Sequence, residues 1–137
     1  MKKVSIAAAL LVLTGCASAP PAGEYLAYEE NHVLVEKKSP GLAVALGFLP
    51  GGGSFYAGYP GKGVINFLTW PISIFWDPVS GYHGSKMTNY NATKVELAKK
   101  KRADIDGLTA KYQAGSIDEK TYIFEKGEID RKYTFIN

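Results

Sequence analysis

Hydrophobic residues fall into three runs along the chain: residues 4–13, 42–49 and 64–76. A stretch rich in Gly, Pro and Tyr, residues 50–63, joins the second run to the third. Apolar runs on either side of such a turn favour two packed helices. We therefore predict a hydrophobic helical hairpin over residues 41–78.

Polar segments flank the predicted hairpin on both sides. Residues 24–39 are polar with scattered apolar positions, and their spacing fits either a short helix followed by a strand or a lid that lies on a membrane. At the other end, Asp77 and Pro78 close the hairpin, because an ionised carboxylate and a residue without an amide hydrogen both disfavour a buried helix. Residues 79–84 are then expected to form a loop.

The charged C-terminal region, residues 79–137, predicts two helices. From Ser85 onward apolar residues recur near the helical period, and Gly115 closes this first helix. Ser116 stands where it can cap a second helix that runs to about Tyr133. The predicted fold class is mainly α, with a cleaved leader helix, a hydrophobic helical hairpin and a C-terminal helix-turn-helix pair.

The start of the chain has the order of a bacterial export signal. Lys2 and Lys3 precede the first apolar run, which is too short to span about 30 Å of hydrocarbon. The run ends in Leu13-Thr14-Gly15-Cys16, which resembles the lipobox of bacterial lipoproteins.

The lipobox resemblance implies a modified cysteine. Cleavage before Cys16 would remove residues 1–15 as a signal peptide, and Cys16 would carry a covalent diacylglyceryl group and an N-acyl chain. Several acyl chains on one residue give durable anchoring, whereas one chain holds only marginally. Residues 16–40 are then a lipidated tether followed by the polar segment.

The Gly-rich turn carries a motif of its own. A phosphate-binding loop is excluded, because Lys62 is followed by Gly63 rather than by Ser or Thr. The segment resembles the turn of TM2-domain membrane proteins, and Asp77 resembles the acid that closes their second helix. This resemblance covers about residues 39–78 and implies a membrane hairpin rather than a reaction. Its motif positions are Pro50, Gly51, Gly53, Tyr56, Gly58, Lys62 and Gly63.

Length and charge limit how this hairpin can enter a membrane. As a helix, residues 64–76 would cover about 20 Å of a hydrocarbon core of about 30 Å, and Pro71 would kink them. If Cys16 is lipidated, a double span leaves the basic residues 37–38 and 99–102 outside, against the positive-inside tendency. We therefore expect a hairpin that dips into one leaflet or packs against a partner. A full double span and a small soluble hydrophobic core are the alternatives.

The predicted C-terminal turn, residues 114–119, is similar to that of the bacterial short C-terminal domain family. The resemblance implies a small interaction or self-association module. The basic run at residues 99–102 is interpreted as a solvated helix face.

Composition and charge remove several classes of function. Without Lys2 and Lys3 the chain has 14 basic and 13 acidic residues, so its charge does not indicate a nucleic-acid partner. His32 and His83 have no metal-ligand spacing, and Ser54 lacks the sequence of a nucleophile elbow. We expect no catalytic residue, no metal and no cofactor other than the lipid on Cys16.

Together these features predict a non-enzymatic bacterial envelope lipoprotein with a structural or interaction role. Its expected partners are membrane lipid and, through the hairpin or the C-terminal helices, itself or another envelope protein. An accessory subunit of an envelope transport or secretion assembly is the alternative, and an enzyme is third. Ala17 stands where enterobacteria-like systems place the aspartate that favours inner-membrane retention, so the outer membrane is favoured in a Gram-negative cell.

Overall fold

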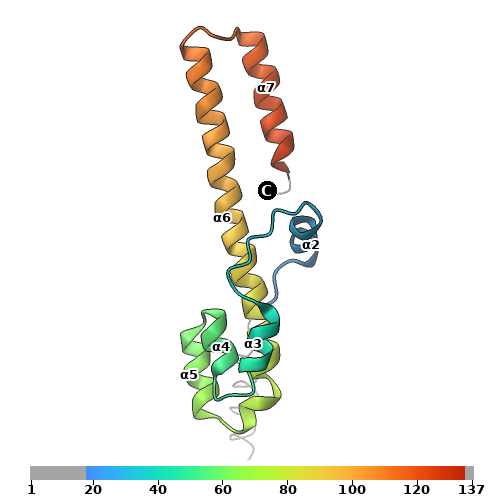
Figure 1. Cartoon of the computed structure of the whole chain (residues 1–137), viewed down its shortest axis with the longest axis vertical. Helices are drawn as coiled ribbons and strands as arrows, with labels where there is room; N and C mark the ends of the chain where they lie inside the picture. Colours follow the sequence, from blue (N-terminus) through green and yellow to red (C-terminus); the bar gives the residue numbers. More distant parts are fainter. Residues whose placement is uncertain (1–17, 135–137) are drawn as a thin grey trace, which may run out of the picture. The chain divides into compact units, whose positions relative to one another are not determined.

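The computed structural model describes residues 18–134 (Figure 1). Over these residues the chain is mainly helical and has no strand, which confirms that the fold is mainly α. The leader and Cys16 lie outside the described residues. The elements are α2 (Ala22–Glu30), α3 (Pro40–Leu46), α4 (Gly52–Ala57), α5 (Pro60–Leu68), the short 3-10 helix η1 (Ile72–Phe75), α6 (Asp77–Gln113) and α7 (Glu119–Lys132).

The chain forms two compact units, which we call the hydrophobic unit and the charged unit. The hydrophobic unit contains the described residues up to Ala22 together with Glu36–Tyr90. The charged unit contains Gly23–Val35 and the described residues from Asn91 onward. The first turns of α6 therefore belong with the hydrophobic helices, whereas the sequence had assigned residues 79–90 to the charged C-terminal region.

The second apolar arm ends before Asp77, but the predicted loop at residues 79–84 is wrong, because α6 begins at Asp77 and continues through them. Proline is tolerated in a first helical turn, where its missing N–H would have no partner in the helix. The Asp77 side chain bonds to other elements instead of ending the apolar region. His83, expected in a loop, accordingly lies within α6.

The hairpin is more divided than the two arms predicted from the sequence. Its Gly-rich turn contains α4, which is bounded by Gly51 at φ 69° and Gly58 at φ 92°. Left-handed backbone of this kind is readily adopted by glycine. The second arm ends as a helix at Leu68 and continues after Pro71 as η1. The predicted interruption near Pro71 is therefore present.

The predicted C-terminal helix pair is confirmed, but its cap is not. Gly115 adopts φ 69° after the end of α6. The N-cap of α7 is Asp118, whose side chain accepts a hydrogen bond from the Thr121 N–H at 2.8 Å, so the assignment of Ser116 was wrong. Both residue types cap helices, and only the point at which the chain leaves the turn selects between them.

The charged unit has an apolar interior and a charged surface. Its buried apolar side chains are Tyr25 and Tyr28 of α2, Leu97 and Leu108 of α6, and Tyr133, the C-cap residue of α7. The rings of Tyr112 and Tyr122 stack with centroids 4.9 Å apart, joining α6 to α7. Two ion pairs, Lys101–Asp130 at 2.9 Å and Lys132–Asp104 at 3.0 Å, link the same helices at the surface.

Candidate functional site

The hydrophobic unit is built with small and polar residues inside. Between residues 41 and 90, every buried position is Gly, Ala, Ser, Asn or Asp, apart from Tyr90. Water-soluble domains bury Leu, Ile, Val and Phe and place polar residues at the surface. This unit therefore reverses the usual arrangement.

Asp77 is the centre of this polar interior. Its side chain accepts hydrogen bonds from the backbone N–H groups of Gly53 and Ser54, at 3.1 and 3.2 Å, in the first turn of α4. The Ser54 hydroxyl and the Asn66 amide donate to it as well, both at 2.6 Å. All four partners are donors, as an ionised carboxylate requires. A negative group at this position also complements the positive N-terminal end of the α4 dipole.

Asn66 extends the network from Asp77 to the segment that precedes α6. Its side-chain amide donates also to the Ser54 hydroxyl at 2.9 Å, and its side-chain oxygen accepts from the Trp76 indole N–H at 2.9 Å. Its backbone carbonyl accepts from the Ser73 hydroxyl at 2.6 Å. Because Asn66, Ser73 and Asp77 are fully buried, these bonds replace the water that each group would otherwise need.

Close backbone contacts surround this network. A side chain at Gly53 would meet the carbonyl oxygens of Asp77 and Ala43 at 2.8 and 2.9 Å. One at Gly81 would meet the Ala43 carbonyl and the Gly53 Cα, each at 2.9 Å. These glycines therefore let α3, α4 and α6 approach one another more closely than larger residues would allow, as small residues do between membrane helices.

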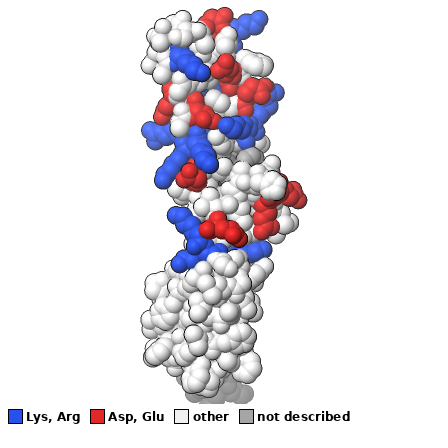
Figure 2. Space-filling model, viewed as in Figure 1, with Lys and Arg blue, Asp and Glu red and all other residues white. Residues whose placement is uncertain are grey.

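The large apolar side chains of this unit point outward. Phe75 is 83% exposed and Leu68 is 75% exposed. In the part of Figure 2 that corresponds to α3, α4 and α5, almost the whole visible surface is uncharged. None of the helices described over residues 18–134 is both long enough and apolar enough to cross a membrane. The exposed set is Leu42, Phe48, Leu49, Phe55, Val64, Phe67, Leu68, Trp70, Ile72, Phe75 and Val79.

The predicted motif residues come together in this unit, apart from Cys16, which lies outside the described residues. Gly51 and Gly58 bound α4, and Gly53 contributes a bond to Asp77. The Tyr56 hydroxyl accepts from the Ser39 N–H at 3.1 Å, and Lys62 lies over the Tyr59 ring. Pro50 is half-buried directly before Gly51, and Gly63 is buried beneath the Phe55 ring.

Sequence reasoning missed Ser54, Asn66 and Ser73 as members of the polar centre. A usable signal was present, because Asn66 and Ser73 are among the few polar residues within the third apolar run. A polar residue that must be buried needs a partner, and Asp77 was the nearest acidic residue in the chain to both of them. The polar interruptions could therefore have been paired with Asp77.

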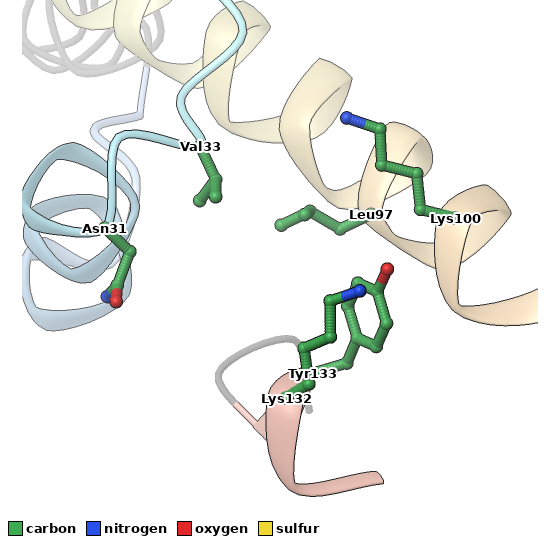
Figure 3. A pocket seen from close by; sticks show the side chains of 6 residues that line it. All are labelled: Asn31, Val33, Leu97, Lys100, Lys132 and Tyr133. Carbon is green, nitrogen blue, oxygen red and sulfur yellow. The ribbon is translucent and has the colours of Figure 1, made fainter. Parts of the chain in front are cut away.

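The charged unit contains a separate cavity of about 420 Å³ (Figure 3). Asp104 accepts hydrogen bonds from Lys132 at 3.0 Å and from the Tyr133 hydroxyl at 2.9 Å. These two bonds hold the pKa of Asp104 below its ordinary value. The charges beside the cavity are thus partly neutralised by one another. The lining residues are Asn31, Val33, Leu97, Lys100, Lys132 and Tyr133.

Comparison with protein-family models, curated proteins and solved structures gives no match for this chain. Among the described residues, no group of three or more His, Cys, Asp and Glu side chains could hold a metal ion. The hydrophobic unit, with its polar interior, and the cavity of the charged unit are the two candidate features of this chain, and the hydrophobic unit is the more distinctive of them.

Proposed function

We propose that this chain is a lipid-anchored lipoprotein of the bacterial envelope whose hydrophobic unit docks into one leaflet of the membrane. Its role is structural or interactive rather than enzymatic. One observation carries the proposal: large apolar side chains cover the outside of a unit whose interior is polar.

The hydrophobic effect favours placing the apolar surface of this unit in a membrane leaflet. Burying one large apolar side chain contributes about 1.5–3 kcal/mol, and soluble monomers rarely expose an apolar patch of more than a few hundred Å². A leaflet would cover many such side chains at once. The same leaflet would penalise unpaired polar groups, and the hydrogen bonds of Ser54, Asn66 and Asp77 keep those groups paired inside the unit.

The sequence motifs support the same proposal. The lipobox-like residues Leu13-Thr14-Gly15-Cys16 would tether the chain to a membrane, with the outer membrane favoured in a Gram-negative cell. The TM2-like motif contributes Gly53, whose N–H is bonded by Asp77. The charged unit would then remain in the aqueous compartment and interact with a second copy or with another envelope protein.

The anchor is tested by changing its nucleophile. Cys16→Ser should abolish incorporation of labelled lipid and leave an uncleaved precursor, because a hydroxyl does not replace the thiol in lipid transfer. Normal lipidation and processing of this variant would overturn the anchor.

Docking of the hydrophobic unit is tested in vesicles that hold the processed lipoprotein. Trp70 and Trp76 are the two tryptophans of the chain, and both lie in this unit. Acyl chains labelled with bromine should quench their fluorescence. The double variant Leu68→Asp with Phe75→Asp should lose the quenching, since a charge at the centre of a membrane costs about 2.5–3.5 kcal/mol on insertion scales.

A matched control comes from the charged unit. Ile123 and Phe124 are 63% and 65% exposed, so Ile123→Asp with Phe124→Asp makes the same chemical change at a similar exposure. This control should keep the quenching of the unaltered protein. Absence of quenching in the unaltered protein, while its lipid still holds it on the vesicles, would contradict docking.

The second proposal is an accessory subunit of a transport or secretion assembly. It is favoured by the shortness of the apolar helices, because α5 has only nine residues and could pack among the helices of another protein. In that case the protein extracted in mild detergent should comigrate with a larger complex on a native gel. A free lipoprotein should migrate alone.

A further inference from the structure

Three lysines of the hydrophobic unit each lie over a tyrosine ring. The ammonium nitrogen is 4.8 Å from the ring centroid in Lys38–Tyr56, 5.6 Å in Lys62–Tyr59 and 5.3 Å in Lys86–Tyr82. Separations below about 6 Å are those of a cation–π contact. We call these three pairs the lysine–tyrosine collar.

Hydrogen bonds place the collar at one level of α6. Asn89 accepts from the backbone N–H groups of Lys37 and Lys38, each at 2.9 Å, and donates to the Lys38 carbonyl at 2.8 Å. One residue earlier, Thr88 donates to the Ala57 carbonyl at 2.8 Å, at the end of α4. The backbone that leads into Tyr59 and Lys62 is therefore fixed beside the same turn that carries Lys86.

The opposite ends of the same helices carry exposed apolar side chains, which we call the apolar tip: Leu68, Trp70, Ile72 and Phe75. Lys62 is in the first turn of α5, and Leu68 is its last residue, about 9 Å further along at 1.5 Å per residue. Phe75 stands just before α6, whereas Lys86 is nine residues into it, or about 13 Å. Cations therefore mark one end of the unit and hydrocarbon side chains mark the other.

Charge is also one-sided in this unit. Among its described residues the acidic side chains are Glu36 and the buried Asp77, whereas the basic ones are Lys37, Lys38, Lys62 and Lys86. Tyrosine rings favour the interfacial level of a bilayer, and lysine stems extend along apolar surface to bring the ammonium group to polar headgroups.

From this placement, and resting on the proposed docking into a leaflet, we propose that the lysine–tyrosine collar binds the phosphate groups of anionic phospholipids while the apolar tip enters the acyl region. The occupant is thus a lipid surface of negative charge. Each lysine near such a surface favours binding by about fivefold, and the collar by on the order of 100-fold at low salt. Added salt screens the effect.

The test uses the processed lipoprotein in two kinds of vesicle: phosphatidylcholine alone, and equal parts of phosphatidylcholine and phosphatidylglycerol. The acyl anchor holds the protein on both, so quenching of Trp70 by brominated acyl chains reports insertion of the tip separately. In the variant Trp70→Phe only Trp76 fluoresces, so this variant measures the part of the quenching that comes from Trp76. We expect a larger inserted fraction with phosphatidylglycerol, and a difference that diminishes as salt is added.

The collar variant is Lys38→Gln with Lys62→Gln and Lys86→Gln. Its preference for inserting into vesicles with phosphatidylglycerol over vesicles of phosphatidylcholine alone should fall about tenfold or more at low salt. Arginine at the same three positions should retain it. The control with the same change in net charge is Lys99→Gln with Lys111→Gln and Lys120→Gln, all exposed in the charged unit. This control should retain the preference.

The outcomes separate the two proposals. Equal quenching in both vesicles overturns the collar and leaves docking intact. Absence of quenching in both kinds of vesicle overturns docking itself. Equal loss in the collar variant and its control assigns the preference to net charge and overturns the collar. Insertion that needs a second envelope protein, with none in pure lipid, would favour the accessory-subunit proposal.

Discussion

The hydrophobic and charged units solve the same packing problem in opposite ways. The charged unit buries apolar side chains such as Leu97, Leu108 and Tyr133 and exposes its charges. The hydrophobic unit buries Ser54, Asn66 and Asp77 and exposes Phe75 and Leu68. In water the first arrangement is stabilised by burial of apolar area, whereas hydrogen bonds and close backbone contact must hold the second. The proposed docking into a leaflet would give each unit the solvent that suits its surface.

The largest expected effect comes from the polar centre. Asp77→Ala would leave the Gly53 and Ser54 N–H groups and the Asn66 amide without their acceptor, at a cost of about 3–5 kcal/mol. Hydrogen exchange should show loss of protection in α3, α4 and α5, with α7 and the end of α6 retained. Unchanged protection in α4 would show that the polar centre does not hold the hydrophobic unit together.

The reverse effect is expected from the apolar interior of the charged unit. Leu108 is only 4% exposed, and Leu108→Ala should destabilise this unit by about 2–5 kcal/mol through lost burial and a cavity. Protection of α7 should fall while α4 retains its protection. If both units lost protection together in this variant and in Asp77→Ala, they would unfold as one cooperative body and the contrast between them would not extend to stability.

A smaller effect separates the two possible caps of α7. Asp118→Ala should lower the thermal midpoint of the charged unit by a few degrees, because the Thr121 N–H loses its acceptor. Ser116→Ala is the matched control and should leave the thermal midpoint nearly unchanged. A larger shift in the control than in Asp118→Ala would restore the serine cap.

The smallest effect is on the pH dependence of the charged unit. Hydrogen bonds lower the pKa values of Asp104, Asp118 and Asp130 from 3.8, chiefly those from Lys132, Thr121 and Lys101 respectively. The stability contributed by each carboxylate is present above that pH and is lost as pH falls through the lowered pKa. The hydrogen bond to Asp104 raises the pKa of Lys132 above 10.5. The stability contributed by the Lys132 ammonium group is therefore fully present below pH 10.5 and is lost as pH rises through the raised pKa. The thermal midpoint of the charged unit, measured at a series of pH values, should therefore decline below about pH 4. Asp104→Asn should make this decline shallower.

Features encoded by near neighbours could be predicted from the chain alone. Helical spacing together with Gly115 predicted the C-terminal pair, and Pro71 predicted the interruption of the second apolar arm. These signals act within a few residues, through backbone conformation and local hydrogen bonds. The hydrophobic runs likewise marked the unit that now carries the exposed apolar surface.

The tertiary structure alone decided which residues occupy the interior. Asp77 was interpreted as a stop because a lone carboxylate is costly in an apolar region, yet partners 23 and 24 residues earlier, Ser54 and Gly53, make its burial favourable. The same runs of Leu, Phe and Ile could have formed a soluble core or an outer surface. Periodicity specifies a helical face, whereas the neighbours that meet that face are set by contacts distant in the sequence. Here small and polar residues meet inside, so the hydrocarbon side chains are left outside.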